Sequence, residues 1–178
     1  MDHVATVRFR AVEREDLPIL RDWRTDLMLA GVVRQWRHLN MINQENWLSK
    51  VTKSNRNIMF AFYDEGAILG VAGLTYCDWI RRSSEASIYV GDRSARSRGY
   101  GAAALKELCR YGFDQLGLNR IYAEIFEFNK ASVVLFEKSG FRQEGIREES
   151  HFYQGRFWNA IMVRLLKREW DEITKASS

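Results

Sequence analysis

The sequence predicts an α+β fold with a mixed, mostly antiparallel central sheet flanked by helices. Two observations carry this prediction. Strand-like segments on both sides of Asp64-Glu65-Gly66 indicate a hairpin in the first half, and strand and helix patterns alternate in the second half. A chain of 178 residues can bury a real core as one domain. We expect residues 1–173 to form that domain and residues 174–178 to form a C-terminal tail.

The first half of the chain combines short strands with helices. Val4–Arg10 alternates apolar and polar residues and predicts a strand, while Asp16 and Pro18 favour the start of a helix that runs to Arg24. Residues 24–39 predict a helix or a lid segment. A helix from Asn43 to about Ser54 and strands at 58–63, 68–75 and 85–90 are expected next.

The second half has clearer boundaries. From Gly101 an apolar stripe at helical spacing predicts a helix that ends at Gly117, and a strand follows at residues 120–128. Asn129 is a favourable N-cap for a helix that ends at Ser139, because Gly140 suits the left-handed position after a helix. Residues 141–167 predict two strands joined by a turn at Gln154-Gly155.

Composition and charge exclude several classes of protein. The net charge of +4 does not require a nucleic-acid partner, and two cysteines make neither a disulfide framework nor a metal cluster, so no metal is expected. The absence of a long apolar run and of a signal-peptide pattern predicts a cytoplasmic protein with no membrane partner.

The most informative stretch runs from Val90 to Ala102. An apolar strand stops at a glycine, a loop with three arginines follows, and two glycines one residue apart open a helix. The N–H groups of a helix start have no intrahelical partner, and glycine lets a ligand approach the backbone. This pattern predicts a site for a ligand that carries a pyrophosphate.

Two motifs resemble the GCN5-related N-acetyltransferase (GNAT) superfamily. They are Arg96-x-x-Gly99-x-Gly101 and Asn129-x-x-Ser132, the latter followed by Phe136-Glu137-Lys138-x-Gly140-Phe141. The resemblance covers roughly Arg8 to Trp170. It is greatest to the branch of ribosomal-protein N-terminal, spermidine and nucleotide-linked amino-sugar acetyltransferases.

The resemblance implies acetyl-CoA as co-substrate and a V-shaped split between the fourth and fifth strands that holds the pantetheine arm. It implies that the acetyl group passes by direct attack of a primary amine in a ternary complex. The cofactor-binding residues that it implies are Ile88, Tyr89, Val90, Arg96, Ser97, Arg98, Gly99, Tyr100, Gly101, Ala102, Asn129 and Ser132.

The chemistry needs an oxyanion donor, a proton donor for the thiolate and a base for the amine. A backbone N–H of the fourth strand, that of Val90 or its neighbour, is the natural oxyanion donor. Many family members use a tyrosine acid where this chain has Phe136, so Ser132, which matches the donor suggested for the ribosomal branch, takes that role. The position of that branch's base falls on His151, with Glu85 as an alternative, and both have plain structural readings as strand residues. Further alternative bases are Glu124 and Glu127.

The acceptor is less well indicated than the donor. Trp23-Arg24-Thr25-Asp26 resembles a segment of amino-sugar enzymes, which favours a nucleotide-linked amino sugar or a similar small polar amine. A ribosomal-protein N-terminus and a polyamine are alternatives, although the arginine-rich first third argues against a polyamine. The loss of the tyrosine acid at Phe136 leaves open a silent acetyl-CoA-binding regulatory module, and either a monomer or a homodimer is expected. The candidate substrate-binding residues are Arg24, Trp36 and Tyr153.

Overall fold

The computed structural model describes residues 5–26 and 38–176. The chain divides into two compact parts. The first part holds the described residues up to Thr75 together with Ser87–Leu105, and the second holds Tyr76–Ala86 with the described residues from Lys106 onward. Strands β3 (Ala67–Asp78) and β4 (Ser83–Val90) and helix α4 (Tyr100–Arg110) each contribute residues to both parts.

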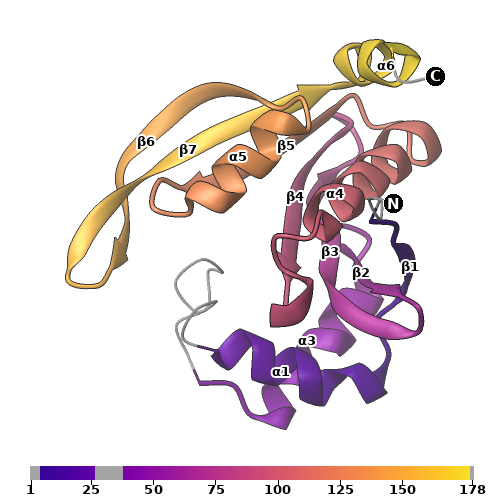
Figure 1. The fold of residues 1–178 in the computed structure, drawn as a ribbon, viewed down its shortest axis with the longest axis vertical. Coiled ribbons are helices and arrows are strands. Elements are labelled where there is room, and N and C mark those ends of the chain that lie inside the picture. Colours follow the sequence, from indigo (N-terminus) through magenta and orange to yellow (C-terminus); the bar gives the residue numbers. More distant parts are fainter. Residues whose placement is uncertain (1–4, 27–37, 177–178) are drawn as a thin grey trace. The chain divides into compact units, whose positions relative to one another are not determined.

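Seven strands of the described chain form a sheet in the order β1-β2-β3-β4-β5-β7-β6 (Figure 1). Strands β4 and β5 run parallel, whereas the pairs β1–β2, β2–β3, β5–β7 and β6–β7 run antiparallel. This confirms the predicted mixed sheet. The strands are β1 (Arg8–Ala11), β2 (Ile58–Asp64), β3 (Ala67–Asp78), β4 (Ser83–Val90), β5 (Arg120–Phe126), β6 (Arg142–Tyr153) and β7 (Arg156–Leu166). The helices are α1 (Leu17–Thr25), α3 (Met41–Lys53), α4 (Tyr100–Arg110), α5 (Lys130–Lys138) and α6 (Lys167–Ala176).

In the first part, β2 and β3 form the predicted hairpin. Glu65 and Gly66 both have positive φ (46° and 85°), as a two-residue turn between twisted strands requires. Helices α1 and α3 lie side by side (Figure 1). They bury an apolar cluster that holds Val12, Leu20, Ala61 and Val71, with Trp23, Trp47, Leu48, Met59, Ile68 and Tyr89 packed against it.

Three expectations for the first part need correction. Strand β1 begins at Arg8 rather than at Val4, which lies outside the described residues. The Asp16 carboxylate does not cap α1, because it accepts hydrogen bonds from the Arg10 guanidinium (2.6 and 2.7 Å) and from the Glu13 N–H (2.9 Å). The Asp16 carboxylate therefore binds Arg10 instead of the N–H groups at the start of α1, and the local sequence does not indicate this pairing. Helix α3 starts two residues earlier than expected, behind an Asn40 N-cap that accepts from Asn43 N–H at 2.9 Å.

In the second part, the parallel ladder joins Ser83–Glu85 to Arg120–Tyr122. The V-shaped split expected between these two strands stays a prediction. The helix that begins with α4 ends in a π-helical turn (Tyr111–Gln115), and β5 stops at Phe126, two residues before its predicted end. There the Asn129 N–H donates to the Phe126 carbonyl (2.8 Å), so the chain already turns toward α5.

The ends of α5 are as the sequence predicts. Asn129 Oδ1 accepts from the Ser132 N–H at 3.2 Å, and Gly140 has φ +88°. The Phe141 N–H donates back to the Phe136 carbonyl (3.0 Å), and the two rings meet edge to face. An N-cap and a left-handed C-terminal turn therefore fix the length of this helix.

Helix α6 corrects the expectation of a tail from residue 174. Its first turn is held by Glu169, whose carboxylate accepts from the Leu166 N–H (3.0 Å) and from Arg164 (2.6 and 2.8 Å). Trp170 is buried against Phe113, with ring centroids 5.9 Å apart. The apolar face of Trp170 and Ile173 is the helical signal in this segment that the sequence analysis missed.

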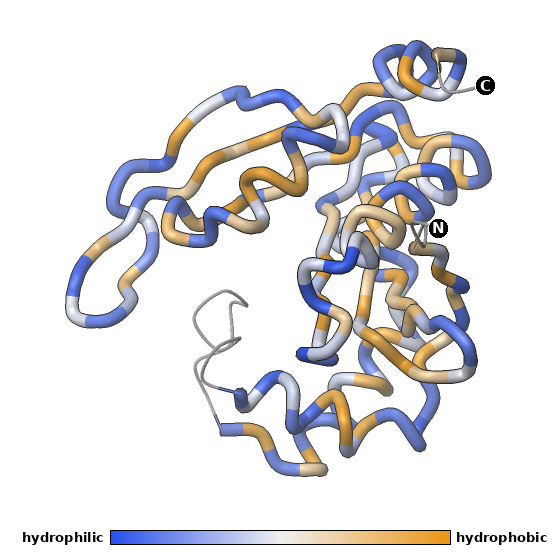
Figure 2. The backbone as a smooth tube through the Cα atoms, in the orientation of Figure 1, coloured by the Kyte–Doolittle hydropathy of each residue, from blue (hydrophilic) through white to orange (hydrophobic). Residues whose placement is uncertain are grey.

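Strands β6 and β7 form a long hairpin that turns at Gln154 and Gly155, as expected (Figure 1). Strand β7 is mostly apolar and partly buried, whereas β6 is mostly polar and exposed (Figure 2). Among the helices that the structure describes, none is long and apolar enough to cross a membrane.

Candidate active site

The segment after β4 makes a compact turn into α4. The Gly91 and Asp92 N–H groups both donate to the Leu69 carbonyl (2.9 and 3.1 Å), and Asp92 Oδ1 accepts from the Ser94 N–H (2.8 Å). Ser97 and Gly99 then adopt positive φ (60° and 86°) before α4 begins at Tyr100. This turn brings a helix N-terminus close behind the strand, which is the arrangement that binds anions through backbone N–H groups.

Glycine is needed at two positions of this turn for different reasons. At Gly99 the backbone has a left-handed conformation that side chains rarely adopt. At Gly91 a Cβ would overlap the indole of Trp23, so the end of β4 lies directly against that ring. Trp23 also meets the Tyr89 ring edge to face, with centroids 6.4 Å apart. Trp23 therefore packs against both residues that flank Val90.

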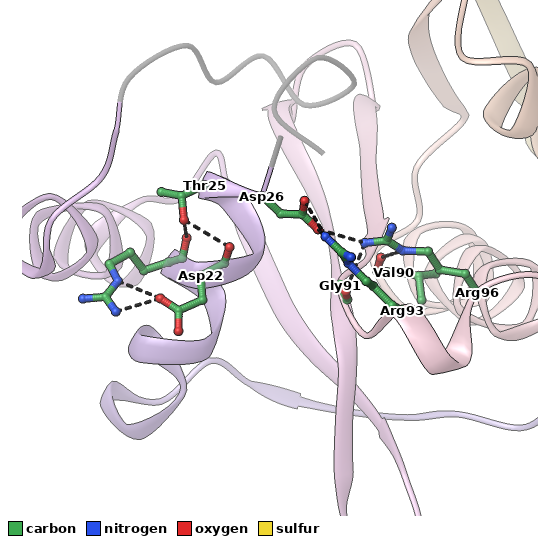
Figure 3. A network of polar contacts seen from close by, with 8 residues as sticks. Asp22, Thr25, Asp26, Val90, Gly91, Arg93 and Arg96 are labelled. Atoms are coloured by element: carbon green, nitrogen blue, oxygen red, sulfur yellow. Dashed lines mark hydrogen bonds and ion pairs between the residues drawn. The ribbon is translucent and has the colours of Figure 1, made fainter. Parts of the chain in front are cut away.

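The arginines of the loop are largely engaged by the protein itself (Figure 3). Arg93 makes a bidentate ion pair with Asp26 (2.9 to 3.1 Å). Arg96 donates from Nε to the Val90 carbonyl (3.2 Å) and from Nη2 to the Gly91 carbonyl (3.1 Å), and it lies 3.9 Å from Asp26. Arg98 lies over the Tyr100 ring at 5.6 Å. Arg96 is expected at the phosphates from its place in the sequence, but its guanidinium points toward the end of β4.

Tyr100 ties the start of α4 to the β2–β3 hairpin. Its hydroxyl donates to the Asp64 carboxylate at 2.8 Å, and this hydrogen bond raises the pKa of the phenol. Tyr100 is buried, although it stands between two glycines of an exposed loop. Its side chain therefore anchors the loop, while its N–H belongs to the helix start.

A pocket of about 630 Å³ lies between the end of α1 and the end of β4. Three carboxylates and one guanidinium line it, with Trp23 and Ile19 as its apolar members. The lining residues are Ile19, Asp22, Trp23, Thr25, Asp26, Gly91, Asp92 and Arg93.

Other substrate candidates of the first part are placed differently from the expectation. Arg24 lies over the Trp47 ring at 5.9 Å, in the packing between α1 and α3 rather than in the pocket lining. Trp36 lies outside the described residues. Arg24 therefore contributes to packing, whereas Trp23 lines the pocket.

In the second part, Asn129 and Ser132 lie together at the start of α5. The side-chain oxygen Oδ1 of Asn129 accepts the Ser132 N–H in the cap, so the side-chain N–H₂ group can act as a donor to a ligand. Ser132 is half-buried and has its N–H in that cap. This geometry is that of a helix N-cap, and the acid role of the Ser132 hydroxyl stays a prediction.

His151 stands in an aromatic stack that ends next to α5. Its ring lies 3.7 Å from that of Phe126, nearly parallel to it at 10°, and 6.1 Å from that of Phe128. Tyr153 stacks on Phe128 from the same strand, with centroids 5.0 Å apart. Because Phe128 directly precedes Asn129, the stack brings His151 and Tyr153 to the same end of α5 as Asn129.

A polar network that the sequence analysis missed shapes the strand before His151. Asn159 donates its N–H and its side-chain amide to Glu127 (3.1 and 3.2 Å) and accepts the Glu149 N–H (2.9 Å). Glu149 has φ +46°, and the β6–β7 register shifts between Arg147 and His151. The network thus holds the bulge that sets the position of His151. An asparagine within the apolar run of β7 was the available signal.

The carboxylates considered as alternative bases have structural partners. Glu127 holds Asn159, and Glu124 pairs with Arg147 at 3.2 Å. Glu85 is half-buried in β4 and lies opposite Tyr122 in the parallel ladder. No set of His, Cys, Asp and Glu side chains in the described ranges is arranged to hold a metal ion.

The cysteines are placed as inert residues. Both are buried, and desolvation raises the pKa of the Cys109 thiol well above its usual range. Cys77 Sγ lies 3.3 Å from Ser84 Oγ. Burial therefore keeps both thiols away from a substrate.

Comparison with known proteins identifies the family. Residues 6–142 match the acetyltransferase (GNAT) domain. The chain is 32% identical over 168 residues to the uncharacterized N-acetyltransferase p20 of Bacillus licheniformis, covering 90% of this chain and 93% of that protein. It is 24% identical over 162 residues to a spermidine N(1)-acetyltransferase of Vibrio cholerae, covering 90% and 93%.

The fold is that of solved acetyltransferases. The crystal structure of the Vibrio cholerae spermidine N-acetyltransferase in complex with CoA and spermine matches with a TM-score of 0.88 at 23% identity, over 93% of this chain and 98% of that chain. The fold and acetyl-CoA as co-substrate, both implied by the sequence motifs, are confirmed. The chain belongs to the acetyltransferase (GNAT) family and is an acetyl-CoA-dependent N-acetyltransferase.

Proposed function

We propose that this enzyme acetylates a small cationic amine of the polyamine type. The observation that carries the proposal is the pocket at the end of β4, where three carboxylates face one guanidinium beside Trp23. Because Asp22 is paired with Arg21 and Asp26 with Arg93, the carboxylate that attracts an ammonium group is mainly that of Asp92, and the Trp23 ring adds a surface for the alkyl chain of the amine. The spermidine acetyltransferases among the relatives fit the same substrate class.

The structure weakens the argument against a polyamine that the sequence suggested. In the sequence alone, the arginines of the first third of the chain have no assigned partners and count as free positive charge. Arg10 is paired with Asp16, Arg21 with Asp22, and Arg24 lies over Trp47. The carboxylates paired with Arg10 and Arg21 reduce the repulsion that these two arginines would exert on a cationic substrate. The preference for a nucleotide-linked amino sugar loses support, because Arg24 of its Trp23-Arg24 motif lies over Trp47 and is not part of the pocket lining.

In this proposal acetyl-CoA extends along the end of β4. Its pyrophosphate accepts hydrogen bonds from the backbone N–H groups of residues 97–102, at the start of α4. The pantetheine amides pair with residues 88–90 of β4, and Asn129 donates to them through its amide. The turn into α4 and the left-handed residues Ser97 and Gly99 support this placement.

The catalytic groups are assigned by the chemistry that the reaction needs. The neutral amine attacks the thioester carbonyl and forms a tetrahedral oxyanion, which the Val90 N–H stabilises. His151 takes the proton from the ammonium group, directly or through water. The carbon–sulfur bond then breaks as the Ser132 hydroxyl donates a proton to the CoA thiolate, and the proton that the attacking nitrogen loses returns to Ser132, directly or through water. Glu85 is the alternative base.

A thiol-release assay with an amine panel tests the substrate class. The panel holds spermidine, a nucleotide-linked amino sugar and a peptide with a ribosomal-protein N-terminus. We expect the highest kcat/KM with spermidine. Preferred turnover of the amino sugar or the peptide would overturn the proposal, and turnover of no amine would favour a silent acetyl-CoA-binding module.

Asp92→Asn tests the pocket itself, because asparagine keeps the cap on Ser94 but removes the charge. We expect the KM for spermidine to rise roughly two- to fivefold, the effect of about 0.5–1 kcal/mol for one partly exposed charge, with no change in the KM for acetyl-CoA. Glu45→Gln, on the exposed face of α3 and outside the pocket lining, is the matched control. An equal effect of both substitutions would place the amine elsewhere.

A further inference from the structure

The peptide groups at the end of β4 are held from both edges of the strand. The Gly91 and Asp92 N–H groups donate to Leu69 of β3 on one edge. The Val90 carbonyl instead accepts the Arg96 Nε, and the Gly91 carbonyl accepts Nη2 of the same guanidinium (Figure 3). Because the N–H and C=O groups of one strand residue point to the same edge, the Val90 N–H also faces away from β3. The regular strand pattern ends there, since the N–H and the carbonyl of Gly91 have partners on different elements.

Arg96 is itself fixed by a carboxylate from another element. Asp26, at the end of α1, lies 3.9 Å from Arg96 and forms a bidentate pair with Arg93. The side chains of Asp26 and Arg96 are only 15% and 26% exposed, so water screens their interaction less than that of a surface pair. The planar guanidinium is thus held between a carboxylate and two carbonyls, a geometry that the ammonium of a lysine cannot reproduce.

We propose that Arg96 is a positioning residue for catalysis and that Asp26 orients it. Its two hydrogen bonds fix the orientation of the peptides on either side of Gly91, next to the Val90 N–H that stabilises the oxyanion. The inference rests on the proposed placement of the thioester at Val90. It differs from a phosphate-binding role in a measurable way: loss of Arg96 impairs the chemical step for any acyl donor, whether or not that donor carries phosphates.

The test compares two acyl donors and two substitutions. Acetyl-CoA carries the pyrophosphate, whereas S-acetylpantetheine has the same thioester and no phosphate. We expect Arg96→Met and Arg96→Lys both to lower kcat roughly 10- to 100-fold with acetyl-CoA, because small misplacements of catalytic groups have effects of this size. The KM for acetyl-CoA should stay within about threefold, and kcat/KM should fall by the same factor with both donors.

A phosphate role predicts the opposite pattern. Arg96→Lys would then retain most of the activity, since lysine also binds phosphate, and the loss in Arg96→Met would be confined to the KM for acetyl-CoA. Either result would overturn the inference, as would unchanged kinetics in both variants. The lysine substitution decides the question with acetyl-CoA alone should S-acetylpantetheine be a poor donor. Asp26→Asn, which leaves Arg96 in place, should lower kcat in the same sense by a smaller factor.

Gly101→Val separates this inference from the proposed placement of the cofactor. A side chain there should block the approach of the pyrophosphate and weaken acetyl-CoA, with little effect on S-acetylpantetheine. If Gly101→Val instead affects both donors equally, the phosphate loop is misplaced, whatever the Arg96 variants do. Thermal unfolding of each variant shows whether a loss of rate reflects a loss of fold.

Discussion

Replacing His151 by phenylalanine separates its two possible roles. The imidazole lies 3.7 Å from the Phe126 ring and 10° from parallel to it, so a phenyl ring can occupy the same place in the stack. We therefore expect the free energy of unfolding to change by less than about 1 kcal/mol, since an aromatic pair contributes roughly 0.5–1.5 kcal/mol beyond its buried area. The phenyl ring cannot accept a proton, and general-base catalysis typically contributes about 10²- to 10⁴-fold.

The expected result is a folded enzyme whose kcat/KM is at least 100-fold lower and whose pH profile lacks the limb near the usual histidine pKa of about 6.5. The measurements are a pH–rate profile by thiol release and a thermal melt of the same preparation. His151→Ala is the companion variant, because it removes both the base and the stack. If His151→Phe keeps its rate and pH limb while His151→Ala loses stability, His151 is a packing residue and the base must be sought at Glu85.

Two further predictions concern stability. Gln44 is 1% exposed on α3, and within the described residues neither atom of its amide has a hydrogen-bond partner; Gln44→Met should therefore raise the free energy of unfolding by about 1–3 kcal/mol, read by thermal or urea unfolding, and a lower stability would mean that the amide is satisfied. The hydrogen bonds from Arg10 lower the pKa of Asp16, so its contribution is present above the unfolded pKa and is lost as the pH falls through the lower folded value. Asp16→Asn should lower stability at pH 7 by about 1.5–3 kcal/mol and flatten its decline below about pH 4, as urea titrations at several pH values would show; a parallel decline in both proteins would contradict the assignment.

Features that depend on local chemistry were predictable from the sequence. The Asn129 cap, the left-handed Gly140 and the turns at Gly66 and Gly155 follow from residues that act on their own backbone within a few positions. The family motif also predicted acetyl-CoA as co-substrate, because glycines at positions 99 and 101 leave the backbone open to a phosphate.

Features that depend on long-range pairing were not predictable. Asp16 was assigned as a cap because its neighbours form a helix, but Arg10 on β1 takes its carboxylate. Glu127 was considered as a base, but Asn159, 32 residues away, occupies it. In both cases the sequence indicated a carboxylate with a specific role. The role it has in the fold depends on a hydrogen-bond partner that the sequence pattern does not reveal.

Arg96 shows the same limit within the motif that identified the family. In the sequence it belongs to a run of arginines beside a phosphate loop, and charge alone assigns it to the phosphates. In the structure its partners are two carbonyls and Asp26, 70 residues earlier. A guanidinium satisfied in this way would have to give up hydrogen bonds to reach a phosphate, and the end of β4 would lose its support on one edge. We therefore propose that the two roles are divided: the backbone N–H groups of the loop bind the phosphates, and Arg96 holds the end of β4 in the position that the thioester needs.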